Sequence, residues 1–366
     1  MTSEHGQVDL VFAATAAGQV AINRRIGNIR QLAFVDGERR VAPLHTAPWV
    51  GEAAGELPAG LDPVERGLSG DFFCAPFGAN NLEPGPIHGW TANSAWQVLE
   101  HGEGTLGLRL ERPVMGATVF KSLSLGRNAP LLSQRHRIVG GEGRLPVAHH
   151  PMIHMAAGGR FTTSAKRLAL TPEMPLEPGR NRLACPAGST DPAAFPAAGG
   201  GTVDLGQLPV GRGTEDFVTL IEAEGSRLGW SAVLRAAEDD IVIVLKDPRV
   251  LPVTMLWHSN GGRDYSPWNG RHSGVLGIED GVAPGAAGHR GVLGANPISD
   301  AGVPVALDLA PGREHVIEHA ILAFARPAGW GAVADVEISG DRLTVTADTG
   351  GNRSFDLDPE IGLPGR

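Results

Sequence analysis

The sequence predicts an all-β protein, and three observations support this fold class. Apolar and polar residues alternate over short stretches along most of the chain, for example in residues 105–110 (TLGLRL), and this period-two pattern is typical of half-buried strands. The 366 residues include 51 glycines and 28 prolines, which implies many turns between short strands. Helical spacing is scarce, because the segment with some 3.6-residue periodicity, residues 230–240, is short and flanked by strand patterns.

The expected strands begin near the N-terminus. The short apolar stretch within residues 8–16 is interpreted as a first strand rather than a secretory signal, because an acidic residue stands where such a signal has lysine or arginine. We therefore expect a cytoplasmic protein. Alternating strands are then predicted at residues 105–110, 118–126 and 131–139.

Two later segments predict strands in different environments. Residues 241–248 (IVIVLKDP) form a continuous apolar run, which fits a strand buried on both faces. Residues 343–358 place Gly-Gly-Asn between two alternating runs, and this is a hairpin signal because glycine and asparagine tolerate positive φ.

The domain organisation is predicted from the segment 186–213. Its high content of proline, glycine and alanine indicates a long surface excursion between strands. Strand patterns of the same kind continue on both sides, so we expect one antiparallel domain spanning residues 1–366 rather than two domains.

Composition excludes several classes of partner. Lys+Arg 31 against Asp+Glu 40 gives a net charge of −9, and without a basic stripe the chain is not expected to bind nucleic acid. No apolar run approaches the roughly 18 residues of a membrane span, so no membrane partner is expected. Two cysteines, Cys74 and Cys185, cannot form a disulfide framework.

Two motifs for cofactors or metals fail on their context. Gly102, Gly104 and Gly107 match G-x-G-x-x-G, but a strand pattern follows where a dinucleotide site needs a helix, so no cofactor is expected. His150 and His154 have the spacing of a zinc helix, but Pro151 and the lack of a glutamate after the first histidine break that motif. No metal site is predicted, although a metal held by His149, His150 and His154 stays an open alternative.

Three segments concentrate aromatic, amide and imidazole groups: residues 71–96, 148–155 and 251–280. Flat apolar rings among fixed hydrogen-bond donors suit a polyhydroxylated ring, so we expect a small carbohydrate ligand. The groups that indicate it are Trp90, Trp96, Trp257, Trp268, Asn80, Asn81, Asn93, Asn260, Asn269 and Arg263.

These residues resemble the aldose 1-epimerase (galactose mutarotase-like) family over most of the chain. Ile87-His88-Gly89 is similar to the family's His-Gly step, and His150-Pro151 is similar to its His-Pro step. The stretch 276–280 (LGIED) resembles the late strand that carries its catalytic glutamate. The order of these steps along the chain also agrees with the family.

The resemblance implies a galactose-mutarotase-like β-supersandwich, in which two large twisted antiparallel sheets pack together and a concave face binds the sugar. It implies Glu279 as general base on the anomeric hydroxyl and His150 as general acid on the ring oxygen, with His88 as a second polar contact. Opening a cyclic hemiacetal needs one group to take a proton and another to supply one across the C1 region. A carboxylate and an imidazole can do this without a metal or redox cofactor.

The sequence also departs from the family pattern. Met152 stands where family members carry an aromatic residue after the His-Pro step, and Thr214 stands where they carry an aspartate ahead of a phenylalanine. Glu215 and Asp216 lie closer to that phenylalanine, and we expect Asp216 to contact sugar hydroxyls. Asn80 or Asn81 takes the place of the family's arginine before the His-Gly step. These changes predict an altered substrate choice or a loss of catalysis.

The predicted function is therefore that of an isomerase, a sugar mutarotase that interconverts α and β anomers by acid/base ring opening. The substrate contacts are expected from Asn80, Asn81, Trp90, Asp216, Trp257, Arg263 and Trp268. Two alternatives stay open: a non-catalytic carbohydrate-binding or sensing protein on the same fold, and an epimerase or lyase acting on a modified sugar. We expect a monomer or a homodimer.

Overall fold

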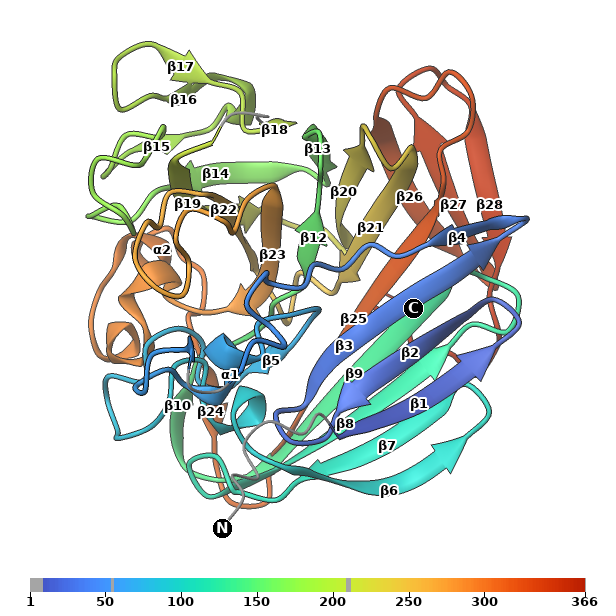
Figure 1. Cartoon of the computed structure of the whole chain (residues 1–366), viewed down its shortest axis with the longest axis horizontal. Helices are drawn as coiled ribbons and strands as arrows, with labels where there is room; N and C mark the ends of the chain where they lie inside the picture. Colours follow the sequence, from blue (N-terminus) through green and yellow to red (C-terminus); the bar gives the residue numbers. More distant parts are fainter. Residues whose placement is uncertain (1–8, 54–55, 209–211, 366) are drawn as a thin grey trace.

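The computed structural model describes residues 9–53, 56–208 and 212–365 (Figure 1). Strands dominate this part of the chain, and they form two large antiparallel sheets with several smaller ones. The predicted all-β class is confirmed.

The larger sheet has nine strands, and its outer strands β6 to β9 follow one another in the chain. In spatial order the strands are β18 (Gln207–Leu208), β13 (Gly159–Thr163), β20 (Gly229–Arg235), β21 (Asp240–Lys246), β25 (Glu314–Ala325), β9 (Leu131–Gly140), β8 (Ala117–Leu125), β7 (Thr105–Leu110) and β6 (Trp96–Gly102).

The second large sheet has eight strands and carries the candidate functional residues. In order these are β15 (Gly188–Ser189), β14 (Lys166–Leu170), β19 (Thr214–Glu222), β22 (Val253–Asn260), β23 (Val275–Val282), β11 (Val147–His149) and β5 (Phe73–Cys74). The eighth strand, β12 (Met152–His154), also pairs with β23.

Smaller sheets complete the architecture. One has four strands, β1 (Leu10–Thr15), β2 (Gly18–Asn23), β3 (Asn28–Asp36) and β4 (Arg39–Val41), and another has three, β26 (Val333–Ser339), β27 (Arg342–Ala347) and β28 (Asn352–Asp356). Two strand pairs are formed by β10 (Gly143–Leu145) with β24 (Leu307–Leu309) and by β16 (Phe195–Pro196) with β17 (Thr202–Val203). The expected first strand and the C-terminal hairpin are thus present as β1 and as β27 with β28.

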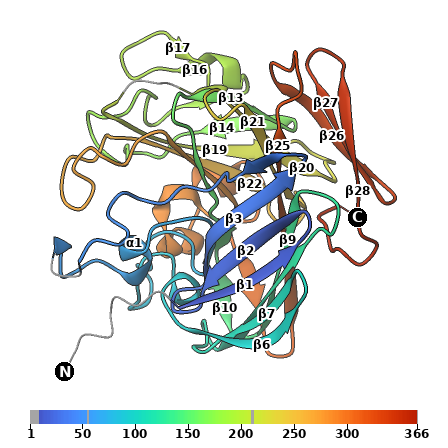
Figure 2. The same cartoon turned by 45° about the vertical axis from the view of Figure 1, so that its right-hand side comes forward.

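The sheets pack in layers. The eight-stranded and four-stranded sheets share one core with the inner face of the nine-stranded sheet, as shown by Val20 of β2, Val242 of β21 and Ile278 of β23. The three-stranded sheet packs on the opposite, outer face of the nine-stranded sheet (Figure 2). We call the face of the eight-stranded sheet that points into the sandwich its inner face, and the other its outer face.

This layering explains the strand patterns in the sequence. In β7, Leu106, Leu108 and Leu110 are buried while Thr105 and Arg109 are exposed, as the alternation predicts. Strand β21 is buried along its whole length. Its even and odd residues belong to two different cores, because the three-stranded sheet covers its second face.

Helices are short in the described residues. They comprise α1 (Pro63–Arg66), α2 (Pro297–Asp300) and the 3₁₀ turns η3 (Trp90–Ala92), η4 (Pro192–Ala194), η5 (Gly285–Ala287) and η6 (His289–Leu293). Among them, none has the length and apolar character that crossing a membrane requires.

The segment 186–213 contains short strands and one 3₁₀ turn rather than a continuous sheet. The pair β16–β17 lies at its tip in Figure 1. Phe195 nevertheless inserts fully into the main core, while residues 209–211 lie outside the described part of the chain.

Candidate active site

The register between β11, β12 and β23 brings the predicted acid and base together. Val147 lies opposite Val282 on one side of His150, and Met152 lies opposite Gly277 on the other. Because the register is the same on both sides, His150 faces Glu279. Successive residues of a strand point to opposite faces. His149 and Ile278, which precede His150 and Glu279, therefore lie on the other face of the sheet.

His150 and Glu279 meet on the outer face of the eight-stranded sheet. The Nε2 atom of His150 lies 3.0 Å from Oε1 of Glu279, and both side chains are buried. Phe72 stacks on the imidazole with ring centroids 4.5 Å apart, which fixes the plane of the ring. Gly277 leaves space for the carboxylate, since a Cβ there would lie 3.1 Å from Glu279 Oε1.

His88 lies beside this pair. Its ring meets that of His150 edge-on, with centroids 5.2 Å apart. The main-chain N–H of Gly78 donates to Nδ1 of His88 over 3.3 Å, so a neutral ring carries its proton on Nε2. Burial, and then the nearby His150 and Arg263, hold the pKa of His88 well below its usual value. His88 is therefore a neutral hydrogen-bond donor beside His150.

Aromatic side chains form a wall next to the pair. The indole of Trp257 meets the His150 ring at 5.7 Å, and Trp268 lies 6.0 Å from Trp257. The guanidinium of Arg263 lies over the Trp268 ring at 4.4 Å and over Trp257 at 5.4 Å. His272 stacks against Trp257, with ring centroids 5.4 Å apart. Three of the predicted sugar-contacting residues are thus brought together.

Glu215, and not Asp216, is the strand β19 carboxylate of this site. Its oxygens accept hydrogen bonds from Trp257 Nε1 over 2.7 Å and from Ser259 Oγ over 3.2 Å. Its Oε1 also lies 3.3 Å from Nε of Arg263. Asp216 points to the inner face, where it binds Arg182 and the main-chain N–H of Leu183. The expectation for Asp216 is corrected because adjacent strand residues face opposite sides.

The environment of Glu215 predicts a pH-dependent stability. Burial raises the pKa of Glu215 to about 7, although Arg263, Trp257 and Ser259 oppose this, while Glu177 adds to it. An unfolded glutamate titrates near 4.5, so unfolding releases a proton between these values and stability falls as the pH rises through this window.

We expect the wild type to lose up to about 3 kcal/mol relative to Glu215→Gln between pH 4.5 and 7. Urea unfolding of both proteins at several pH values measures this difference, and comparison with the variant cancels the other titrating groups. A difference that stays constant across the window would contradict the assignment.

The remaining predicted contacts, Trp90, Asn80 and Asn81, have other described surroundings. The ring of Trp90 is covered by the guanidinium of Arg112 at 3.7 Å and packs against the main core. Asn81 donates to the carbonyl of Ala287 and accepts from the N–H of Arg290, so it anchors a loop. Asn80 has a buried Oδ1 atom without a hydrogen-bond partner. For these three residues, the described contacts give no link to His150 or Glu279.

Sequence reasoning missed Phe72, His272 and the role of Glu215. Phe72 and His272 lie inside the segments 71–96 and 251–280, so their composition was noted but not their orientation. Alternation along β19 relative to Phe217, a buried residue on the same face, would have selected Glu215. Met152, where the resemblance led us to expect an aromatic residue, is fully buried.

The open alternative of a metal held by His149, His150 and His154 is not supported by their positions. His149 lies on the inner face and His150 on the outer face, whereas Nδ1 of His154 lies 3.7 Å from Glu238. A different group, Asp71, His149 and His319, has ligand atoms within 4.8 Å of one another. However, the His149 and His319 rings stack nearly parallel, 4.1 Å apart at 8°. Lone pairs in parallel ring planes do not converge on one ion.

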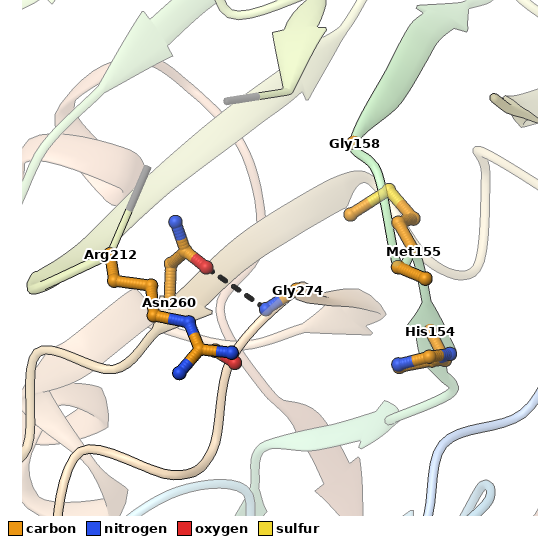
Figure 3. A pocket seen from close by; sticks show the side chains of 8 residues that line it. His154, Met155, Gly158, Arg212, Asn260 and Gly274 are labelled. Carbon is orange, nitrogen blue, oxygen red and sulfur yellow. Dashed lines mark hydrogen bonds between the residues drawn. The ribbon is translucent and has the colours of Figure 1, made fainter. Parts of the chain in front are cut away.

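A separate polar hollow lies at the ends of β22 and β12 (Figure 3). It has a volume of about 220 Å³ and is bordered by Asn260 and Arg212 on one side and by His154 and Met155 on the other. The amide of Asn260 accepts a hydrogen bond from the N–H of Gly274 over 3.0 Å. Neither member of the acid–base pair lines this hollow.

Comparison with known proteins gives a match by structure alone. No protein-family model and no curated protein matches the sequence. A protein of Escherichia coli that is provisionally assigned as an aldose 1-epimerase has a TM-score of 0.59 at 15% identity, covering 87% of this chain and 99% of its own. A galactose mutarotase related enzyme from Lactobacillus acidophilus has a TM-score of 0.55 at 12% identity, covering 87% and 99%.

The chain has the galactose mutarotase-like fold. The predicted β-supersandwich is confirmed, with the nine-stranded and eight-stranded sheets as its two large layers. Within this galactose mutarotase-like fold, the acid–base pair lies on the outer face of the eight-stranded sheet, under the loops that carry Phe72 and Trp268.

Proposed function

We propose that this protein is a sugar mutarotase that interconverts the α and β anomers of a free aldose. The observation that carries the proposal is the buried contact of His150 Nε2 with Glu279 Oε1 at 3.0 Å. An imidazole and a carboxylate held this close, in a site lined by aromatic rings, are suited to act as acid and base on neighbouring atoms of one substrate.

The proposed reaction moves two protons. Glu279 takes the proton of the anomeric hydroxyl while His150, as an imidazolium, donates a proton to the ring oxygen, and the C1–O5 bond breaks. Rotation about the C1–C2 bond then presents the other face of the aldehyde. Glu279 returns its proton to O1 and the O5 hydroxyl returns its proton to His150 as the ring closes with inverted C1. Each positioned proton transfer contributes about 10²–10⁴-fold to the rate.

The neighbouring groups have supporting roles in this proposal. The neutral His88 donates a hydrogen bond from Nε2 near the ring oxygen, and Glu215 binds a sugar hydroxyl. Trp257 and Trp268 supply flat surfaces for the C–H faces of the sugar ring. Arg263 spans both indoles and contacts Glu177 and Glu215 at 3.1 and 3.3 Å, so it stands at the edge of the sugar position.

The direct test follows the approach to anomeric equilibrium. Freshly dissolved α-D-glucose, α-D-galactose, α-D-xylose and β-D-mannose are each monitored by polarimetry and proton NMR, with and without the protein. We expect at least one sugar to reach equilibrium faster in proportion to protein concentration. Binding without acceleration would favour a sugar-binding protein, and a new unsaturated product from an acidic oligosaccharide would favour a lyase. Either result would replace the mutarotase proposal.

A further inference from the structure

A chain of buried polar side chains runs through the interior of the sandwich, behind the acid–base pair. On the inner face, Asp280 is the neighbour of Glu279, and His149 is the neighbour of His150. The nine-stranded sheet contributes His319, which lies in register between Lys246 and Gln134 on adjacent strands. We call Asp71, His149, His319, Asp280, Lys246 and Glu222 the interior polar chain; all six are buried.

The contacts in this chain are continuous from one sheet to the other. Nε2 of His319 lies 3.2 Å from Oδ2 of Asp280. Lys246 Nζ lies 3.1 Å from the other oxygen of Asp280 and 2.9 Å from Glu222. Thr254 donates its hydroxyl to Asp280 over 2.7 Å. The carboxylate of Asp280 is therefore held from three directions.

The other end of the interior polar chain reaches the backbone of His150. The His149 ring stacks on His319, and its Nδ1 lies 3.6 Å from Oδ2 of Asp71. Oδ1 of Asp71 accepts the main-chain N–H of His150 over 3.0 Å, and Gln134 donates to Oδ2. Both strands that carry the pair are thus fixed to the facing sheet within one residue of the reacting side chains.

Simple stabilisation does not account for this arrangement. Burying charged groups costs desolvation free energy, and apolar residues of similar volume stabilise a core at least as well. Such groups are better suited to specify one geometry, because hydrogen bonds between charges have defined distances and directions. The chain lies directly behind the pair, where geometry matters most for proton transfer.

We propose that His319 is a positioning residue, which, through Asp280 and the stacked His149, holds Glu279 and His150 in the geometry that proton transfer requires. This inference rests on the proposed function for its kinetic readout. His319 belongs to the nine-stranded sheet. It lies on the inner side of the eight-stranded sheet, away from the reacting side chains, and does not touch the substrate.

The variants His319→Phe and His319→Gln separate positioning from packing. Phenylalanine keeps the flat ring against His149 but loses the contact with Asp280, whereas the glutamine amide can replace the Nε2 donor. We expect His319→Phe to lower kcat for the sugar found in the panel about tenfold or more, with KM changed less than about threefold, and His319→Gln to restore most of kcat. His258→Phe is the matched control, since His258 is a buried imidazole that faces the interior of the sandwich from the eight-stranded sheet and lies outside the interior polar chain.

A second measurement keeps the inference testable if no sugar is converted. Ring-nitrogen NMR shifts of His150, assigned with Glu279→Gln, report its contact with Glu279 without any substrate. Inactivity of the wild type towards every sugar refutes the proposed function alone; a changed His150 signal in His319→Phe but not in His319→Gln then supports positioning. Unchanged kcat per folded molecule, or an unchanged His150 signal, overturns it. If His319→Phe does not fold, Thr254→Val, which also removes a donor to Asp280, is judged by the same two readouts.

Discussion

Replacing Glu279 with glutamine is expected to slow anomer interconversion by about 10²–10⁴-fold. Glutamine has nearly the same shape, so Phe72, Gly277 and the His150 ring keep their places, but its amide cannot take a proton from the anomeric hydroxyl. Sugar binding should persist, because the indoles of Trp257 and Trp268 are unchanged. Polarimetry gives the rate, and tryptophan fluorescence titration with the same sugar gives the affinity.

Glu314→Gln is a suitable control for this experiment. Glu314 is an exposed carboxylate on β25 that pairs with Arg137, so its loss changes the net charge equally without touching the site. Full activity in Glu279→Gln would remove the general base from the mechanism. Loss of sugar affinity together with rate would instead assign Glu279 to binding.

Replacing Lys246 with methionine is expected to destabilise the protein by about 3–5 kcal/mol. Lys246 Nζ lies within 3.1 Å of both Asp280 and Glu222 in a region closed to water. Contacts with Lys246, His319 and Thr254 hold the pKa of Asp280 well below its usual range, although burial alone would raise it. The variant therefore leaves an anionic carboxylate without its main cation. Urea unfolding measures the free-energy change.

Arg249→Met is the control for the loss of one cation. Arg249 lies three residues beyond Lys246 and pairs with Asp247, but its side chain is 66% exposed, so little change in stability is expected. Equal stability of the two variants would show that water reaches Lys246 and that the interior polar chain is not shielded from solvent.

The sequence was sufficient to predict the fold class and the meeting of His150 with Glu279 in one site. Alternating strands predicted the sheets because burial on one face leaves a period of two. His150 and Glu279 were predicted from the order of family motifs, and the constant register across Pro151 explains how residues so distant in the chain become neighbours. The residue type and its motif were enough, since the fold determines where they meet.

Orientation across a strand was harder to predict. Glu215 and Asp216 are adjacent residues that carry the same functional group, a carboxylate. The choice between them depends on which face of the sheet carries the site. The interior polar chain could not be predicted either. His319 and Lys246 become neighbours through the pairing of β21 with β25, and they reach Asp280 only when the two sheets pack. Such contacts between layers leave no periodic signal in the sequence.

The opposite orientation of His149 and His150 makes the residues between β11 and β12 intolerant of length changes. Inserting or deleting one residue at the N-terminal side of His149 would exchange the two imidazoles between the faces, since a shift of one position inverts every side chain of a strand. Each face would then receive a histidine, but with the wrong neighbours. The spacing from Val147, which pairs with Val282, to Met152, which pairs with Gly277, must therefore stay unchanged for both imidazoles to keep their neighbours.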